Sequence, residues 1–186
     1  MKTKENAAVH PELAEMRVNV EDETHAYKAR HFMAITRFSI GWYFLWAFID
    51  KVFGLTFSTE PADAWIRGGS PTYGYLTFAT EGSPFHGFFA SLTGPFADWL
   101  FMIGLLGIGL ALIAGIGMKI AAVSGALMLV LMWAADLPLA TNPFMDDHIV
   151  FALVLGALAA YGAGRYWGLG RKWEQLPIVQ RFPILK

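Results

Sequence analysis

The sequence of 186 residues contains no cysteine, and this absence removes several kinds of chemistry. Without thiols the chain has no disulfide, no thiol nucleophile, no zinc–thiolate site and no iron–sulfur ligation. Charged residues are also scarce, at 16% compared with the roughly 25% that is typical of soluble domains. The formal net charge of −1 provides no overall field that would recruit nucleic acid, so no nucleic-acid partner is expected.

Apolar residues are abundant instead, at 55% of the chain, and the mean hydropathy is +0.44. Four apolar runs have spanning length or come near it, at residues 32–54, 96–117, 120–139 and 149–166. A hydrocarbon core about 30 Å thick needs roughly 20 helical residues, and none of these runs alternates as a barrel strand would. The sequence therefore predicts an all-α integral membrane protein, a bundle of four transmembrane helices in up-down order.

The remaining segments divide the chain around this bundle. We expect an N-terminal tail at residues 1–30, a transmembrane domain at 31–168 and a C-terminal tail at 169–186 that is cytoplasmic or lies along the membrane surface. The connection at residues 56–94 is far longer than a simple link and is rich in aromatic residues, including Trp65 and Tyr73. Such a loop is expected to be structured, either as a lid over a ligand or as an aromatic belt at the headgroups.

Basic residues indicate the orientation of the helices. Five of the 14 precede the first run, one lies in the turn between runs two and three, and five lie from Arg165, at the end of the fourth run, onward. Because cytoplasmic segments carry the excess of lysine and arginine, both termini are expected to be cytoplasmic and the 56–94 loop to face outward. The predicted location is a prokaryotic cytoplasmic membrane, crossed several times.

Small residues recur at four-residue spacing on two of the predicted helices. Such stripes let helix backbones approach closely in lipid, so these faces are expected to pack against neighbours. The residues are Gly107, Ala111 and Gly115 on one helix and Ala152, Gly156, Ala160 and Gly164 on the other.

Ionisable groups collect at the predicted outer ends of the helices. Asp98, Asp146 and Asp147 begin helices, where a carboxylate favours the helix dipole, so capping explains part of this layer. Asp136 ends a helix, where the dipole disfavours a carboxylate, and it therefore needs a partner such as Lys51 or His148. At membrane depth Arg37 is expected either to serve a function, to extend to the interface, or to pair with a carboxylate.

These outer-layer residues fit a quinone, whose ring stacks on aromatics and whose reduction consumes two protons. Lys51 and His148 are expected to hold the quinone oxygens, and Asp136 and Asp147 to relay protons. Arg37 and five aromatic residues complete the expected binding set. The aromatic residues are Trp46, Trp65, Tyr73, Trp99 and Trp133. No pair of histidines lies on facing helices, so no haem is expected, and no metal is expected either.

Residues 37–51, an arginine followed by a glycine, an aromatic-rich stretch and a terminal lysine, resemble the first-helix signature of the DoxX/DoxD family of membrane proteins. Residues 65–71, 142–148 and 162–165 are similar to that family too. The resemblance implies a four-helix membrane subunit like DoxD, the quinone-reacting large subunit of thiosulfate:quinone oxidoreductase, which works with a small DoxA subunit. The chain carries no fused domain of the DoxA kind, so the resemblance implies a separate partner subunit.

Two functions follow as hypotheses. The first is a membrane subunit of a quinone-linked oxidoreductase that passes electrons from an outer donor, thiosulfate by resemblance, to menaquinone or ubiquinone. The second is a non-enzymatic scaffold or assembly partner for a redox or respiratory complex. Both include lipid and a protein partner, and both leave open whether the chain forms a homo-oligomer.

Overall fold

The computed structural model describes residues 11–186, with side chains from residue 21 onward. Within that range the chain forms helices and no strand, as the sequence predicts. Four of these helices make up the body of the protein. They are α2 (Pro11–Phe53), α4 (Pro95–Ala114), α5 (Met118–Ala135) and α6 (Asp147–Tyr161).

The connection between α2 and α4 is structured and carries four short helical elements. They are η1 (Pro61–Asp63), η2 (Trp65–Arg67), the π-helical η3 (Tyr75–Ala79) and α3 (His86–Ser91). After α6 the chain folds into four more short elements. They are η4 (Ala163–Arg165), α7 (Gly170–Trp173), α8 (Pro177–Arg181) and η5 (Pro183–Leu185).

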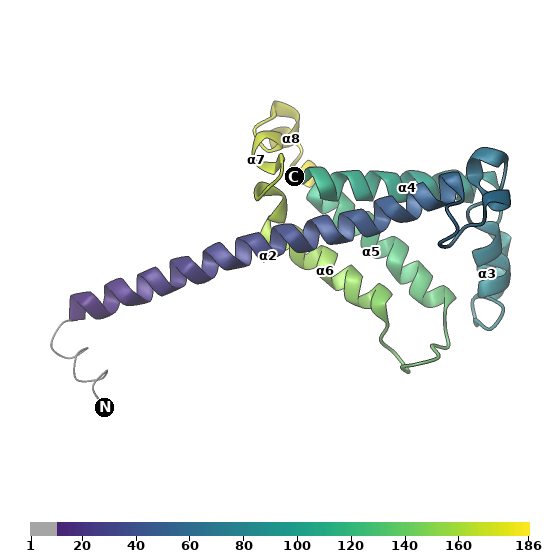
Figure 1. The fold of residues 1–186 in the computed structure, drawn as a ribbon, viewed down its shortest axis with the longest axis horizontal. Coiled ribbons are helices and arrows are strands. Elements are labelled where there is room, and N and C mark those ends of the chain that lie inside the picture. The colour runs from purple at the N-terminus through teal and green to yellow at the C-terminus, as the bar shows by residue number, and fades with distance from the viewer. Residues whose placement is uncertain (1–10) are drawn as a thin grey trace.

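Helix α2 is longer than the first apolar run, because it continues over 43 residues without a break. The expected tail at residues 1–30 therefore belongs in part to this helix, and residues 1–10 of that tail lie outside the described range. Between Pro11 and Gly41 the sequence has neither proline nor glycine, so nothing interrupts the helix before it reaches the apolar part. Figure 1 shows the first half of α2 extending beyond the rest of the molecule.

Three helical segments are long and apolar enough to cross a membrane: Glu21–Phe53, Pro95–Ala114 and Met118–Ala135. Helix α6 is apolar but has 15 residues, fewer than the others. The sequence prediction of an apolar helical membrane protein is thus confirmed. Outward-facing side chains such as Ile103, Val123 and Leu153 are more than 60% exposed, which suits a surface covered by lipid.

Helix α2 packs along α4, α5 packs along α6, and α4 also contacts α5, for example where Ile108 lies near Gly125. Glycines make the closest approaches between these pairs. A Cβ on Gly109 would lie 2.9 Å from the backbone nitrogen of Leu45, and one on Gly125 would lie 2.7 Å from Cδ1 of Leu155. The packed faces of α4 and α5 therefore each place a glycine against a leucine of the partner helix.

The predicted small-residue faces are packed only in part. A Cβ on Gly107 or on Gly156 would meet nothing within 4 Å, so neither position is a point of close helix packing. Only Gly115 and Gly164 approach each other closely, and both lie beyond the helix ends. Ala111 and Ala152 of the same stripes do pack against the core, so each stripe lies partly inside and partly outside the packed face of its helix.

The antiparallel helices give the body two distinct ends. At one end lie the last turn of α2, the start of α4, the end of α5, the start of α6 and the 54–94 connection. At the other end lie the α4–α5 turn and the short elements that follow α6 (Figure 1). These two ends carry different chemistry.

Candidate functional site

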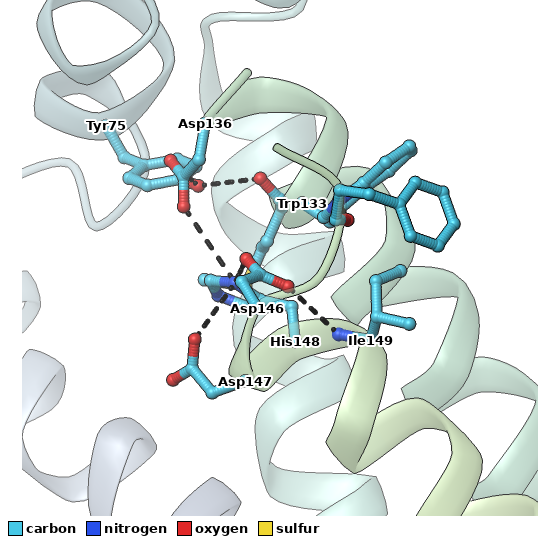
Figure 2. Close-up of polar contacts among 9 residues, drawn as sticks. Tyr75, Trp133, Asp136, Asp146, Asp147, His148 and Ile149 are labelled. Atoms are coloured by element: carbon cyan, nitrogen blue, oxygen red, sulfur yellow. Dashed lines mark hydrogen bonds and ion pairs between the residues drawn. The ribbon is translucent and has the colours of Figure 1, made fainter. Parts of the chain in front are cut away.

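A cluster of five polar residues lies where α5 ends and α6 begins. Asp136 directly follows α5, Asp146 caps the N-terminus of α6, and Asp147 and His148 are the first two residues of that helix. Because α5 and α6 pack side by side, these groups meet although ten residues separate Asp136 from Asp146. Tyr75, from η3, completes the set, and Figure 2 shows these residues together. We refer to these five residues as the polar cluster.

His148 is the centre of the polar cluster. Its Nδ1 lies 2.8 Å from an Asp146 oxygen, 3.7 Å from an Asp147 oxygen and 3.9 Å from an Asp136 oxygen. The imidazole is 13% exposed, and the carboxylates range from 15% for Asp146 to 66% for Asp147. Three carboxylates thus face one nitrogen of the imidazole.

Asp146 performs two tasks in this arrangement. One oxygen accepts a hydrogen bond from the backbone N–H of Ile149, which caps α6, and the other contacts Nδ1 of His148. Burial alone would raise the pKa of Asp146, but the hydrogen bonds from His148 and Ile149 outweigh burial and lower that pKa. An ionised carboxylate only accepts hydrogen bonds, so Nδ1 of His148 must carry the proton that it shares with Asp146. Nε2 is then the nitrogen that remains available to a ligand.

Asp136 has two partners. The Tyr75 hydroxyl donates to Asp136 Oδ1 at 2.8 Å and also lies 3.2 Å from the carbonyl oxygen of Met132, while His148 approaches the other Asp136 oxygen. Burial, with the bonded carboxylate of Asp136 adding to it, raises the pKa of Tyr75, so the phenol stays a donor. Of the two partners predicted for Asp136, the structure places His148 nearby.

Tyr75 is not among the site residues that the sequence predicts. The signal available was a tyrosine within the short apolar segment of the connection, because a partly buried phenol requires a hydrogen-bond partner. Its partner lies 61 residues further along the chain, and only the folded connection brings the two groups together.

Trp133 lies beside the polar cluster, one turn before Asp136 on α5 (Figure 2). Its indole N–H donates to the carbonyl of Phe144 at 3.0 Å, and the two ring centroids lie 6.1 Å apart. The Asn142 side chain accepts hydrogen bonds from the backbone N–H groups of Phe144 and Met145 and so shapes the approach to α6. The loop thereby holds an aromatic pair next to the carboxylates.

The cluster also contains a set of metal-type ligands. One ligand atom each from Asp136, Asp146 and His148 lies within 4.8 Å of the others. These three are the residues that could hold a cation, although the sequence analysis expects no metal.

The other predicted quinone-binding residues lie in separate contacts. Lys51 Nζ is 6.0 Å from the ring centroid of Phe101, and the predicted Lys51–Asp136 pair is not formed. The predicted aromatic residues pair at several places rather than around one ring. Trp46 contacts Phe57, Trp65 contacts Trp99, and Tyr73 contacts Phe78. The predicted layer is therefore several small aromatic contacts, of which only the Trp133 pair adjoins the polar cluster.

Arg37 belongs to the opposite end of the body and binds backbone. Its guanidinium is fully buried and donates to the carbonyls of Leu112 and Ile113 in the last turn of α4 and to those of Tyr166 and Trp167. None of the three expected roles fits, because Arg37 neither reaches the polar cluster, nor extends to the interface, nor pairs with a carboxylate. It satisfies carbonyls that a helix leaves unpaired at its C-terminus.

Two further aspartates hold the connection in place. Asp98 accepts hydrogen bonds from the hydroxyls of Ser70 and Thr72 and from the Thr72 N–H, and it does not cap α4 as expected. Asp50, fully buried, accepts from Ser58 and from backbone N–H groups that follow α2. Asp146 caps its helix with a side-chain hydrogen bond, whereas Asp98 lies in the first turn of α4 as expected but directs its carboxylate to loop donors.

Comparison of the chain with family models, curated proteins and solved structures finds no match.

Proposed function

We propose that the chain is a membrane subunit of a quinone-linked oxidoreductase, with the quinone headgroup bound at the polar cluster. The observation that supports this best is His148, whose Nδ1 faces three carboxylates and whose Nε2 is thereby assigned to proton exchange. A quinone needs a hydrogen-bond donor at a ring oxygen and a proton source close to lipid, and this cluster offers both.

The proposed membrane arrangement includes α6 as a fourth span. At 1.5 Å per residue the 18 residues of α5 extend about 27 Å, and the 15 of α6 about 22 Å. The following η4 turn lengthens the apolar path by about 6 Å, which brings α6 near the roughly 30 Å of the hydrocarbon core. With four spans the 54–94 connection and the polar cluster lie on the same side, which basic-residue bias predicts to be the outer side.

The residues around the cluster fit a quinone headgroup. Trp133 and Phe144 provide flat surfaces for stacking, and Phe144 is 61% exposed, so a ring can reach it from the lipid. A headgroup that enters from the bilayer requires an open face rather than an enclosed cavity. The proposed quinone site does not include five of the residues predicted for it, namely Lys51, Trp46, Trp65, Tyr73 and Trp99.

The chain's own groups hold and move protons in this proposal. Reduction of a bound quinone consumes two electrons and two protons; with thiosulfate as donor, two thiosulfates give one tetrathionate and the two electrons. The imidazolium form of His148 gives one proton from Nε2, is protonated again from solvent and gives the second, while Asp146 keeps the ring oriented. Asp136, held by Tyr75, and the more exposed Asp147 connect the imidazole to solvent. Thiosulfate, and a separate donor-side subunit, follow from the DoxX/DoxD resemblance.

The proposal is tested with Asp136→Asn and His148→Gln in the purified full chain. In proteoliposomes that also contain the donor-side subunit, each variant is expected to lower thiosulfate-dependent reduction of a soluble quinone at least about tenfold, or roughly 1.4 kcal/mol in barrier. The quinone content of the purified protein, measured by mass spectrometry of its lipid extract, is expected to fall for His148→Gln. Asp63→Asn removes an exposed carboxylate from the same connection and is the matched control.

Two results would contradict the proposal. One is full activity in both cluster variants. The other is a loss of folded yield that accounts for the whole loss of activity, which would make the cluster a stabilising network and nothing more.

The second candidate function, a membrane scaffold for a redox or respiratory complex, rests on a different observation. The first half of α2 projects beyond the body, and Tyr27 and Phe32 on it are more than 60% exposed (Figure 1). A partner subunit would cover such a surface. Purified protein without quinone, together with cluster variants that change only stability, would favour this function.

A further inference from the structure

A cavity of about 310 Å³ lies at the end of the body opposite to the polar cluster. Its wall combines the start of α5, the end of α6, η4 and α7, so four separate elements contribute to it. We call it the basic pocket, after the cationic residues that line it. The side chains that matter here are Lys119, Arg165, Trp173, Glu174 and Lys186.

The charges around the basic pocket are unbalanced. Three cationic side chains and one side-chain carboxylate, that of Glu174, line it, so these side chains carry a formal charge of +2. Glu174 accepts two contacts from Nε of Arg165, at 2.9 and 3.1 Å, so the terminal guanidinium nitrogens remain available as donors. Nζ of Lys119 donates one hydrogen bond to the carbonyl of Pro183 at 3.1 Å, and its two other N–H groups remain available.

The pocket is built by tertiary contacts. The backbone N–H of Lys119 donates to the carbonyl of Lys186 at 2.9 Å, and the indole of Trp173 donates to the carbonyl of Leu185. A Cβ on Gly164 would lie 2.4 Å from the carbonyl oxygen of Gly115, so the chain after α6 sits tightly against the α4–α5 turn. These contacts bring Lys119 and Lys186 together across 67 residues of sequence and hold them there.

The pocket lies where membrane spans end. Lys119 is the second residue of α5, and Ile120 and Val123 on the next turn are exposed apolar residues. A lysine at this level reaches headgroups while its helix continues into hydrocarbon. Basic pockets between membrane helices suit phosphate headgroups, and indole rings such as that of Trp173 favour the same depth.

We propose that the basic pocket binds the phosphate group of an anionic phospholipid, with the acyl chains lying along the outer face of α5. Lys119, Arg165 and Lys186 contact the phosphate, and Glu174 orients Arg165. The proposal does not depend on the quinone function, because the pocket and the polar cluster lie at opposite ends of the body. Inorganic phosphate has the same chemistry as the headgroup, so the experiment must separate the two sources.

The test measures thermal unfolding of the full chain in detergent with dioleoylphosphatidylglycerol, dioleoylphosphatidylcholine or inorganic phosphate added. Phosphatidylglycerol is expected to raise the melting temperature, and phosphatidylcholine and millimolar phosphate are expected to leave it unchanged. Lys119→Gln combined with Lys186→Gln is expected to weaken the apparent affinity for phosphatidylglycerol at least about fivefold.

The matched control is Lys172→Gln combined with Arg181→Gln, which removes the same charge from exposed residues of the same end that do not line the pocket. This pair is expected to keep the wild-type response. Equal weakening in both double variants would overturn the proposal, since diffuse charge would then explain binding. Equal stabilisation by phosphatidylcholine or by inorganic phosphate would also overturn it.

The single variant Lys186→Gln separates loss of lipid binding from loss of folding. Within the described residues the Lys186 side chain makes no hydrogen bond or ion pair, so Lys186→Gln is expected to melt at the wild-type temperature without lipid. It is expected to lose part of the phosphatidylglycerol response. A full response in this variant and in the Lys119 and Lys186 double variant would exclude the pocket as the binding site.

Discussion

At the residue scale, two ionisable groups inside the predicted membrane layer have opposite uses. The hydrogen bonds of Arg37 all go to backbone carbonyls, from two distant segments, whereas Asp136 belongs to a group of side chains that exchange hydrogen bonds. Because its acceptors are backbone carbonyls, which do not titrate, the hydrogen-bond pattern of Arg37 has one state. A set of carboxylates around an imidazole has several protonation states, and this property makes it the better candidate for chemistry.

Arg37→Met is expected to lower the free energy of unfolding by about 3 kcal/mol, because the carbonyls of Leu112, Ile113, Tyr166 and Trp167 lose their buried donor. Arg37→Lys keeps the charge but has no planar fork, so an intermediate loss is expected. Unfolding in detergent measures both. Wild-type stability of Arg37→Met would show that other groups can satisfy these carbonyls.

At the element scale, α2 and α4 pack closely at the positions where a glycine of one helix contacts a leucine of the other. Gly41 of α2 lies against Leu112 of α4, and Gly109 of α4 lies against Leu45 of α2, so the contact is reciprocal. Helix α4 also carries Gly107, which lies in a similar sequence, but a Cβ at Gly107 would have no neighbour within 4 Å. Periodicity alone does not distinguish these two glycines, because both lie in an apolar helix.

Gly109→Leu is therefore expected to destabilise the protein by about 1–3 kcal/mol through overpacking against Leu45. Gly107→Leu is the matched control on the same helix, and it is expected to change the melting temperature little, as is Gly156→Leu on α6. Melting of the detergent-solubilised protein gives the comparison. The opposite order of stability would mean that the open glycines face a neighbour, such as a second copy.

At the scale of the whole molecule, the number of spans decides which ends share a side of the membrane. If α6 crosses, Gly82 in the 54–94 connection and Lys172 after α6 lie on opposite sides. If only the three longer helices cross, these two residues lie on the same side. Both are exposed, and a side chain at Gly82 would meet nothing within 4 Å, so both suit labelling.

Because the chain has no cysteine, single cysteines can be introduced without background removal. Gly82→Cys is expected to react with an impermeant maleimide in intact cells, and Lys172→Cys only after permeabilisation. Labelling of both residues in intact cells would show that α6 does not cross. The reverse pattern would keep four spans and invert the orientation, which would move the polar cluster to the cytoplasmic side.

The sequence by itself determined the helical class, the apolar segments and the N-terminal cap of α6 at Asp146. Hydropathy, helix-breaking residues and capping act over a few residues, so they can be read locally. The sequence also pointed to Asp136, Asp147 and His148, because a carboxylate at a helix C-terminus requires a partner wherever the chain folds. It did not establish where α2 begins, since the polar residues before the apolar run are equally compatible with helix.

Only the tertiary structure decided which distant groups meet. Tyr75 reaches Asp136 because the connection folds over the end of α5, and Arg37 reaches α4 rather than the cluster because of how α2 lies on α4. The same holds for the basic pocket, whose lysines are joined by the chain that folds back after α6. The physical reason is common to all three. Packing direction and loop path depend on many contacts at once, and no local pattern of residues encodes them.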